Sequence, residues 1–406
     1  MVETPPRPTL QRRLGLIGLT LYGLGVTIGA GIYVLIGQVA GLAGAAAPFA
    51  FLLAAFVAGL TAMSFAELSV RLPHSAGEAV YVRQGLGSPA LALVTGLAVA
   101  LTGMVAAAAV LIGAAGYLAT LAPLAPWIIA LALIVVLCAL AVWGIAESVA
   151  AIGLVTLVEI GGLLVILAVA APATLSGATW PASGDLPLAA GSFTAAVVVA
   201  FFAFIGFEDM VNVVEEVRAP QHTMPLAIGL TLIATTVLYV SLVCAALGVA
   251  GPAELADSTA PLALVFERAT GLSAAPFAVV AGIATVNGVL VLVIMASRVL
   301  YGLARQGSLP AALGHVWGRT GTPALATLLV GAAVLAGALT LPIALLAQAS
   351  SMLTLTSFTL VNVALIALKR RDAQGTGGFR VPVWWPWLAA LASSGVLIAE
   401  LWRLLA

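Results

Sequence analysis

The sequence predicts an all-α polytopic membrane protein, on the strength of its composition, the length of its apolar segments and the distribution of its basic residues. Hydrophobic residues make up 63% of the 406 positions and charged residues only 7%. Soluble domains carry about 25% charged residues, which keep their surface hydrated. A chain this poor in charge is expected to use lipid as its solvent, and its net charge of zero gives no sign of a nucleic-acid partner.

Apolar segments long enough to cross a bilayer recur along the whole chain. A helix needs about 20 apolar residues to span about 30 Å of hydrocarbon. Transmembrane β-strands are much shorter and alternate in polarity, so a barrel is excluded. We predict eleven helical spans, at residues 15–38, 45–71, 89–120, 126–143, 149–171, 191–214, 224–250, 274–302, 322–340, 343–367 and 383–404.

Basic residues predict the orientation, because the cytoplasmic loops of membrane proteins are enriched in Lys and Arg. With a cytoplasmic N-terminus and alternating spans, thirteen of the fifteen basic residues fall at the inner side, and only Arg268 and Arg403 fall outside. We therefore predict a multi-pass protein of the cell inner membrane. The external residues 251–272 mix apolar and charged positions, which suits either a short amphipathic helix over the external mouth or a solvated linker.

Two spans contain positions where the helix is expected to break. The first span reads TIGAGIY at residues 27–33, and the sixth reads FFAFIGFED at residues 201–209. Glycine is a poor helix former, and non-helical backbone at membrane depth is tolerated only where it faces protein or a cavity. Interrupted spans in corresponding halves are typical of inverted-repeat transporters, whose half-helix ends bind ionic groups. Alternatively, these glycines only allow close helix packing.

Five motifs along the chain resemble those of the amino acid–polyamine–organocation superfamily. They are VTIGAGIYV at residues 26–34, FAEL at 65–68, PHSAGE at 73–78, the sixth-span run together with EEVRAPQ at 215–221, and ASRVLYGLARQG at 296–307. The sixth-span run is similar to that of the cationic amino acid transporter branch. The resemblance implies a five-plus-five inverted-repeat transporter fold with unwound helices 1 and 6, and secondary active transport of amino acids.

This fold would divide the chain into six parts, with one helix more than the two repeats require. Members of the superfamily usually have twelve spans, so a count of eleven leaves the role of the last helix open. The parts are a cytoplasmic N-terminal tail at 1–14, a first five-helix repeat at 15–171, an external loop at 172–190, a second five-helix repeat at 191–368, a cytoplasmic basic loop at 369–382 and an extra transmembrane helix at 383–406.

The resemblance also implies a substrate site at the two breaks. Backbone at the first break is expected to hold the substrate carboxylate, and carbonyl groups at the second break its ammonium. An aromatic ring of the sixth span, Phe204, is expected to close over the substrate as an outer gate. The residues of this predicted site are Ile28, Gly29, Ala30 and Gly31 in the first span and Phe201, Ala203, Phe204 and Glu208 in the sixth.

Glu159, in the fifth span, has no other charged residue within ten positions on either side. Ionisable groups at membrane depth are rare and usually functional. We predict that Glu159 is the ion-coupling group and exchanges a proton, with the first-span carbonyls and the eighth span as its neighbours. Two alternatives remain: a protonated strut hydrogen-bonded between helices, or a ligand of a sodium ion.

Other acidic residues lie near the predicted cytoplasmic ends of their spans. Adjacent helical residues point about 100° apart, so Glu208 but not Asp209 is expected to face the cavity. Glu215 and Arg298 are expected to contribute to an inner gate. Glu67 and Arg71 have the i,i+4 spacing of a structural ion pair.

Taken together, these patterns predict a permease that moves amino acids across the inner membrane and is coupled to protons. The alternatives are a polyamine or other amine carrier and an amino acid exchanger without ion coupling. The chain has neither an enzyme signature nor a phosphate-binding loop, so we predict no enzyme activity, no cofactor and no metal site. The third span carries no acidic residue, which favours neutral amino acids as substrates.

Overall fold

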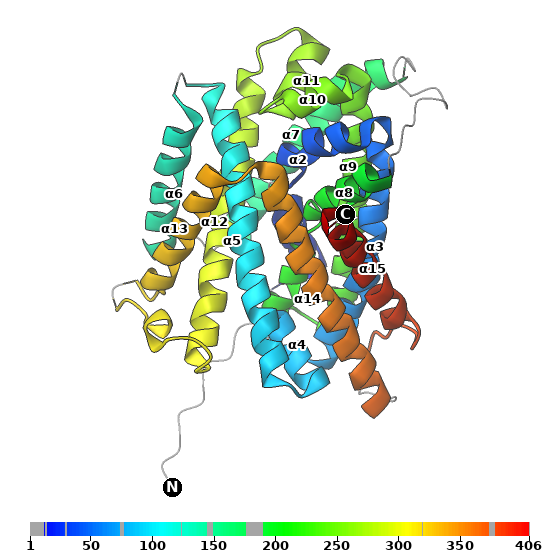
Figure 1. Cartoon of the computed structure of the whole chain (residues 1–406), viewed down its shortest axis with the longest axis vertical. Coiled ribbons are helices and arrows are strands. Elements are labelled where there is room, and N and C mark those ends of the chain that lie inside the picture. The colour runs from blue at the N-terminus through cyan, green and yellow to red at the C-terminus, as the bar shows by residue number, and fades with distance from the viewer. Residues whose placement is uncertain are drawn as a thin grey trace.

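Long helices form a bundle that runs along the longest axis of the molecule (Figure 1). The computed structural model describes residues 12, 14–28, 31–73, 77–122, 124–143, 149–175, 190–318, 320–372 and 378–405. Within these ranges the chain is almost entirely helical, and its β pairing is confined to the isolated bridges Leu14–Val217 and Trp317–Thr322. The prediction of an all-α fold is confirmed.

The helices begin and end close to the predicted limits. The elements are α1 (Leu16–Ile28), α2 (Gly31–Ala43), η1 (Gly44–Ala46), α3 (Ala47–Arg71), α4 (Gly77–Leu86), α5 (Pro89–Ala119), α6 (Pro126–Trp143), α7 (Val149–Leu175), α8 (Ala190–Phe202), η2 (Phe207–Glu216), α9 (Pro220–Val249), α10 (Pro252–Asp257), α11 (Pro261–Thr270), α12 (Ala275–Arg305), η3 (Ala311–Gly314), α13 (Ala324–Thr340), α14 (Ile343–Arg371) and α15 (Trp385–Leu405), where η denotes a 3-10 helix.

Each predicted span coincides with one of these helices or with a pair of them. Of the described residues, nine stretches are long and apolar enough to cross a membrane, and α1 and α13 are shorter apolar helices. The first predicted span is divided into α1 and α2, and the sixth into α8 and η2. The polytopic fold with interruptions in the first and sixth spans is therefore confirmed, while the limits of the two repeats stay a prediction.

The two ends of the bundle differ in what covers them. The short helices α10 and α11 lie at one end, and α4 lies at the opposite end (Figure 1). Residues 251–272 thus contain two short helices, so the linker alternative was wrong. α10 packs closely on α2, because a Cβ atom at Gly37 would lie 2.2 Å from the carbonyl oxygen of Leu255. We refer to the two ends of the bundle as the α10 end and the α4 end.

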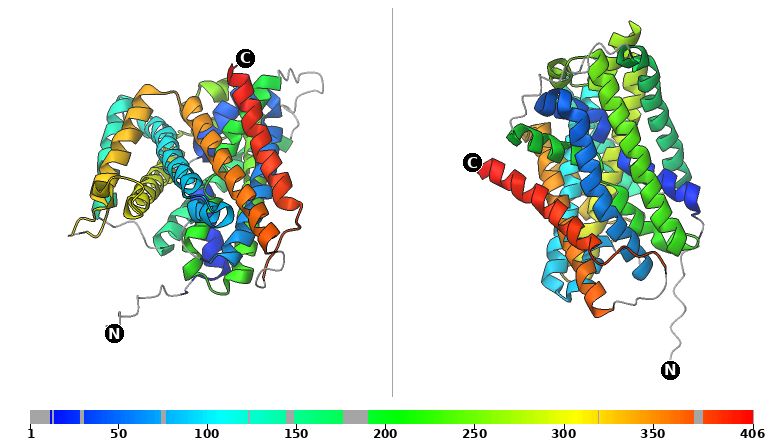
Figure 2. Two further views of the ribbon diagram at one scale, coloured as in Figure 1. Left: turned by 60° about the horizontal axis from the view of Figure 1, so that its bottom comes forward. Right: turned by 90° about the vertical axis from the view of Figure 1, so that its right-hand side faces the viewer.

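The last helix, α15, lies tilted on the outside of the bundle and packs against α3 and α14 (Figure 2). A buried ion cluster joins the three helices at the α4 end. Glu67 Oε1 accepts a hydrogen bond from Arg71 Nε at 2.7 Å, and its Oε2 lies 2.8 Å from Lys369 Nζ. Val381, just before α15, donates its N–H to the same carboxylate and accepts from Lys369. The predicted Glu67–Arg71 pair is confirmed, and Lys369 is an unforeseen third member.

Candidate functional site

The two interruptions meet in the middle of the bundle. A Cβ atom at Gly31, the first residue of α2, would lie 2.6 Å from the Cα atom of Ala203. A Cβ atom at Gly206 would lie 2.7 Å from the carbonyl oxygen of Val26 in α1. Gly206 also has a φ of 125°, which side chains disfavour. Glycine is thus required at both positions for close backbone approach, and the packing interpretation holds alongside the helix break.

The sixth span breaks through a run of tight turns. The N–H groups of Ala203, Phe204 and Ile205 donate to carbonyl groups three residues earlier, at 3.0 to 3.2 Å. The chain then continues as the 3-10 helix η2. In the first span, α1 ends at Ile28 and α2 begins at Gly31. Gly29 and Ala30 lie outside the described residues. One carbonyl at the end of α1, that of Thr27, accepts a hydrogen bond from Tyr239 at 3.0 Å.

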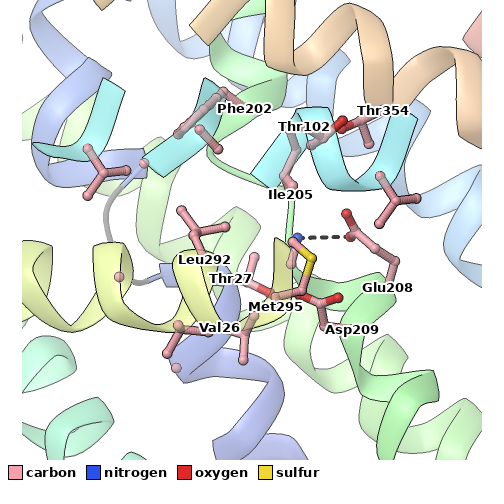
Figure 3. A pocket seen from close by; sticks show the side chains of 18 of the residues that line it. Val26, Thr27, Thr102, Phe202, Ile205, Glu208, Asp209, Leu292, Met295 and Thr354 are labelled. Carbon is pink, nitrogen blue, oxygen red and sulfur yellow. Dashed lines mark hydrogen bonds between the residues drawn. The ribbon is translucent and has the colours of Figure 1, made fainter. Parts of the chain in front are cut away.

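A cavity of about 60 Å³ lies beside this junction. The cavity is lined by residues of α1, α2, α4, α5, α8, α12, α14 and η2 and by the turn between α8 and η2. Phe202 and Ile205 lie on one side and Val26, Leu292 and Met295 on another, while Glu208 and Asp209 lie together at one end (Figure 3). The cavity is therefore largely apolar with an acidic end, and that end is nearer to α4, which contributes Glu78.

The predicted substrate residues divide between the cavity and the surrounding core. Gly31 and Glu208 line the cavity. Ile28 and Ala203 are buried beside it without appearing in its wall, although Ala203 forms the contact with Gly31. Phe201 packs on Phe358, with ring centroids 5.8 Å apart.

Phe204 is not placed to close over the cavity. Its ring packs against Tyr239 and Phe51, with centroid distances of 5.2 and 6.4 Å. Phe202 lines the cavity instead. Side chains two residues apart in a helical turn point to nearly opposite sides. Only one of the two rings, Phe202 or Phe204, can therefore face the cavity. The expected aromatic wall is present, but the ring that forms it is Phe202.

Glu159 is fully buried on α7. Its Oε1 accepts a long hydrogen bond of 3.4 Å from the side-chain amide of Asn287 on α12, and Asn287 also lines the cavity. Its Oε2 has no hydrogen-bond partner among the described residues. The hydroxyl of Tyr33, on α2, donates to the backbone carbonyl of Glu159 at 2.6 Å. The eighth span, α12, is thus a neighbour of Glu159, as predicted.

The acidic end of the cavity differs from the prediction, because both Glu208 and Asp209 line it. The cavity ends against the first turn of η2, so residues on two flanks of that turn border it. Glu208 is oriented by the N–H of Gly206, which donates to its Oε2 at 2.8 Å. Glu78 joins the two from α4, and burial, with a smaller contribution from the charge of Asp209, raises the pKa of Glu78 to about 7.

The predicted gate residues lie away from the central cavity. Arg298 lines a separate cavity of about 330 Å³ together with Ser297, Tyr301 and Thr322. Glu215 lies in the last turn of η2. Their gating role stays a prediction. In the described part of the chain, no group of three or more His, Cys, Asp or Glu side chains is arranged to hold a metal ion.

Sequence reasoning missed several residues of the cavity wall. Glu78 was seen only as part of a motif, although a charged residue beside a span is a usable signal. Asn287 lines the cavity and donates a hydrogen bond to Glu159. Three buried hydroxyls that line the cavity without a hydrogen-bond partner among the described residues, at Thr102, Thr354 and Ser357, carried no distinguishing signal.

Known proteins resemble the chain over almost its whole length. A family model described as amino acid permease matches residues 14–402. The branched-chain amino acid permease BcaP of Bacillus subtilis is 30% identical, over 94% of this chain and 86% of that protein. The vacuolar cationic amino acid transporter 2 of Arabidopsis thaliana is 31% identical over 89% of this chain, which spans only 60% of that longer protein. The methylthioribose transporter of Bacillus subtilis is 30% identical, with coverage of 92% and 85%.

Proposed function

Because the chain belongs to the amino acid permease family, we propose that it is a secondary active transporter that carries amino acids across the cell inner membrane and couples this movement to protons. Membership of this family also means that the chain is a transporter and not an enzyme. The observation that carries the proposal is the meeting of two interrupted spans at a cavity that Asn287 connects to buried Glu159.

The two interruptions supply what a zwitterionic substrate requires. The N-terminus of α2, at Gly31, presents the positive end of a helix dipole, which suits a carboxylate. The end of α1 contributes Gly25 and Val26 to the cavity wall, and backbone carbonyls at such an end suit an ammonium group. The apolar wall, including Phe202 and Leu292, suits a substrate side chain. In this proposal Phe202 is the ring that closes over the substrate.

Proton coupling is proposed for Glu159 from its surroundings. A carboxyl group in a water-free site needs either a compensating partner or a proton. Glu159 has one long hydrogen bond, and its second oxygen has no hydrogen-bond partner in the described part of the structure. Loading of a proton would allow Glu159 to donate where it now accepts. Because Asn287 contacts Glu159 and also lines the cavity, a shift of its side chain would transmit the change in protonation to the cavity.

We further propose that the α4 end faces the cytoplasm. Arg71, Arg83 and Arg305 lie in the last turns of α3, α4 and α12, and the last turn of α14 carries Lys369, Arg370 and Arg371. Positive charge at this end follows the rule for cytoplasmic loops. The side that α10 and α11 cover would then be external.

The test is uptake of radiolabelled amino acids by proteoliposomes that contain the purified protein. An inward proton gradient is compared with a sodium gradient and with no gradient, for the unmodified chain and for Glu159→Gln. Glu267→Gln, on the exposed surface of α11, is the matched control. We expect uptake driven by protons, its loss in Glu159→Gln and its retention in the control.

Other outcomes separate the alternatives. Exchange of preloaded amino acid without any response to either gradient would indicate an exchanger, and Glu159 would lose its coupling role. Uptake that is driven by sodium alone and is lost in Glu159→Gln would assign Glu159 to a sodium site. Uptake of polyamines in place of amino acids would indicate an amine carrier.

A further inference from the structure

The corner of the α4 end where α14 meets α15 carries exposed positive charge. Arg370 and Arg371 lie in the last turn of α14, and Arg83 lies in the last turn of α4. All three residues are exposed. Arg371 Nη1 lies 3.5 Å from the carbonyl oxygen of Gln84, so the last turn of α14 borders α4 on one side.

Acidic residues at this corner do not cancel the positive charge. Glu67 is buried and is matched by its ion pairs with Arg71 and Lys369. Asp372 follows Arg371 and adds one negative charge against the three exposed arginines. The exposed part of the corner therefore keeps an excess of positive charge.

Arg370 is positioned by an aromatic ring. Its Cζ atom lies over the ring of Trp387, on α15, at 5.2 Å from the ring centroid. Within the described part of the chain, the guanidinium groups of Arg370 and Arg83 have no hydrogen bond or ion pair, and that of Arg371 has only the long contact with Gln84. A cation–π contact attracts a guanidinium group without supplying an acceptor for its N–H groups. These N–H donors therefore stay available to an anion.

Exposed apolar side chains continue from the arginines along both helices. On α14, Val363 lies about two turns before Arg370 and is 37% exposed. On α15, Trp387 is 44% exposed, and Leu391, about one turn further on, is 67% exposed. Figure 2 shows the start of α15 beside the end of α14, with α15 on the outside of the bundle. A cationic corner thus adjoins an apolar surface that faces outward.

One class of ligand suits both parts of this surface. Arginine pairs with phosphate through charge-assisted and often bidentate hydrogen bonds. Tryptophan is enriched at the level of the lipid head groups, where the membrane meets water. A phosphate that is joined to acyl chains can contact the arginines and cover the apolar surface together, whereas a soluble anion would leave the apolar surface uncovered.

We propose that Arg370, Arg371 and Trp387 form a binding site for the head group of an anionic phospholipid, whose acyl chains lie along the exposed apolar surface of α14 and α15. Arg83 adds positive charge at the edge of this site. The cytoplasmic leaflet carries anionic phospholipids, which agrees with the orientation proposed for the α4 end. The inference does not depend on which substrate is transported.

Native mass spectrometry of the purified protein in detergent tests the site. The protein is titrated with palmitoyl-oleoyl phosphatidylglycerol and with phosphatidylcholine that has the same chains and no net charge. We expect phosphatidylglycerol to bind about tenfold or more tightly. A basic residue near a membrane surface contributes about a fivefold factor to the binding of anionic lipid, so Arg370→Gln or Arg371→Gln should weaken phosphatidylglycerol binding about fivefold and the double variant about 25-fold.

Three further variants connect the effect to this corner. Arg305→Gln is the matched control, because Arg305 is an exposed arginine in the last turn of α12 at the same end, with no ring contact among the described residues. It should leave the affinity unchanged. Trp387→Phe keeps a ring and should retain most of the binding, whereas Trp387→Leu should lose about as much as Arg370→Gln. Size-exclusion profiles show which variants are folded.

Three results would overturn the inference. Equal affinity for the two lipids would show that the arginines do not select the head group. A loss in Arg305→Gln as large as that in Arg370→Gln would indicate a general attraction of anionic lipid to the basic end. Displacement of phosphatidylglycerol by an equal concentration of inorganic phosphate would show that the acyl chains contribute nothing. Each result concerns lipid binding alone and leaves the proposed transport function standing.

Discussion

Glu67 and Glu159 are both fully buried glutamates within apolar spans, yet their surroundings differ completely. Glu67 accepts hydrogen bonds from Arg71 and from the N–H of Val381, and forms an ion pair with Lys369. Glu159 accepts one long hydrogen bond from Asn287, and its second oxygen has no hydrogen-bond partner among the described residues. A glutamate that serves as a strut between helices looks like Glu67. Glu159 lacks those partners, which supports its proposed role in coupling.

Glu400 is a second buried glutamate that, like Glu67, has a cationic partner. It lies on α15 with no exposed side-chain surface, and Arg403 donates two hydrogen bonds to it, at 2.7 and 3.0 Å. The side-chain amide of Gln348, on α14, also donates to Glu400. Arg403, however, is 32% exposed, whereas Lys369 beside Glu67 is 6% exposed. Loss of the carboxylate should therefore matter less at Glu400 than at Glu67.

The largest effect on stability is expected for Glu67→Gln. The substitution leaves Lys369 as a buried cation without a counter-charge, and breaking a buried pair in this way costs about 3–5 kcal/mol. We expect a marked loss of thermal stability in detergent, measured by fluorescence-detected size exclusion. The double variant Glu67→Gln, Lys369→Met also removes the stranded cation and should recover part of the loss. A stable single variant would show that the cluster is not what fastens α15 to α3 and α14.

A smaller loss is expected for Glu400→Gln. The amide can still accept from Arg403, and the partly exposed guanidinium can turn toward water. The expected cost is about 1.5–3 kcal/mol, the range of a hydrogen bond to a charged group. The same melting assay ranks the two variants directly. If Glu400→Gln proved more destabilising than Glu67→Gln, exposure of the cationic partner would not be what separates the two sites.

Almost no loss of stability is expected for Glu159→Gln. The glutamine amide retains an acceptor for Asn287 and removes a carboxyl group that lacks compensation. The melting temperature should stay the same or rise, while proton-driven uptake is lost. The companion variant is Asn287→Ala, which removes the side-chain hydrogen bond to Glu159 and should alter uptake without unfolding the protein. Strong destabilisation by Glu159→Gln would restore the strut interpretation.

Sequence alone was sufficient for features that depend on local properties. Span length and hydropathy predicted the helices, and glycine content predicted both breaks. Glu159 stood out because it is isolated in an apolar run. The choice between Phe202 and Phe204 was not accessible, because the rotation of a helix is reset where it breaks, so the ring that faces the cavity depends on the turn geometry at residues 203–206.

Contacts between residues that are distant in the sequence could not be predicted from the sequence either. Lys369 and Val381 reach Glu67 from about 300 positions away, and nothing near Glu67 indicates them. The cavity hydroxyls pose a different difficulty, because a Ser or Thr in a helix usually bonds to its own backbone. Only the packing of α5, α14 and η2 around one cavity distinguishes Thr102, Thr354 and Ser357 from Thr235 or Thr285.

The environment of Glu78 lies between those of Glu67 and Glu159, and its effect on stability depends on pH. Glu208 and Asp209 face it from η2, α5 carries no charged residue, and the basic residues of α14 are confined to its last turn. Burial raises the pKa of Glu78 from 4.5 to about 7. Between these two values the folded protein holds a proton that the unfolded chain has lost, so stability falls as pH rises and becomes constant above about pH 7.

Glu78→Gln should remove this contribution, since the glutamine amide does not titrate. The difference in melting temperature between Glu78→Gln and the unmodified chain should therefore grow from pH 5 to pH 7 and then level off, with the variant the more stable. The difference reports Glu78 together with its influence on the neighbouring Glu208, on which the charge of Glu78 acts. A difference that is independent of pH would mean that Glu78 has a partner comparable to those of Glu67.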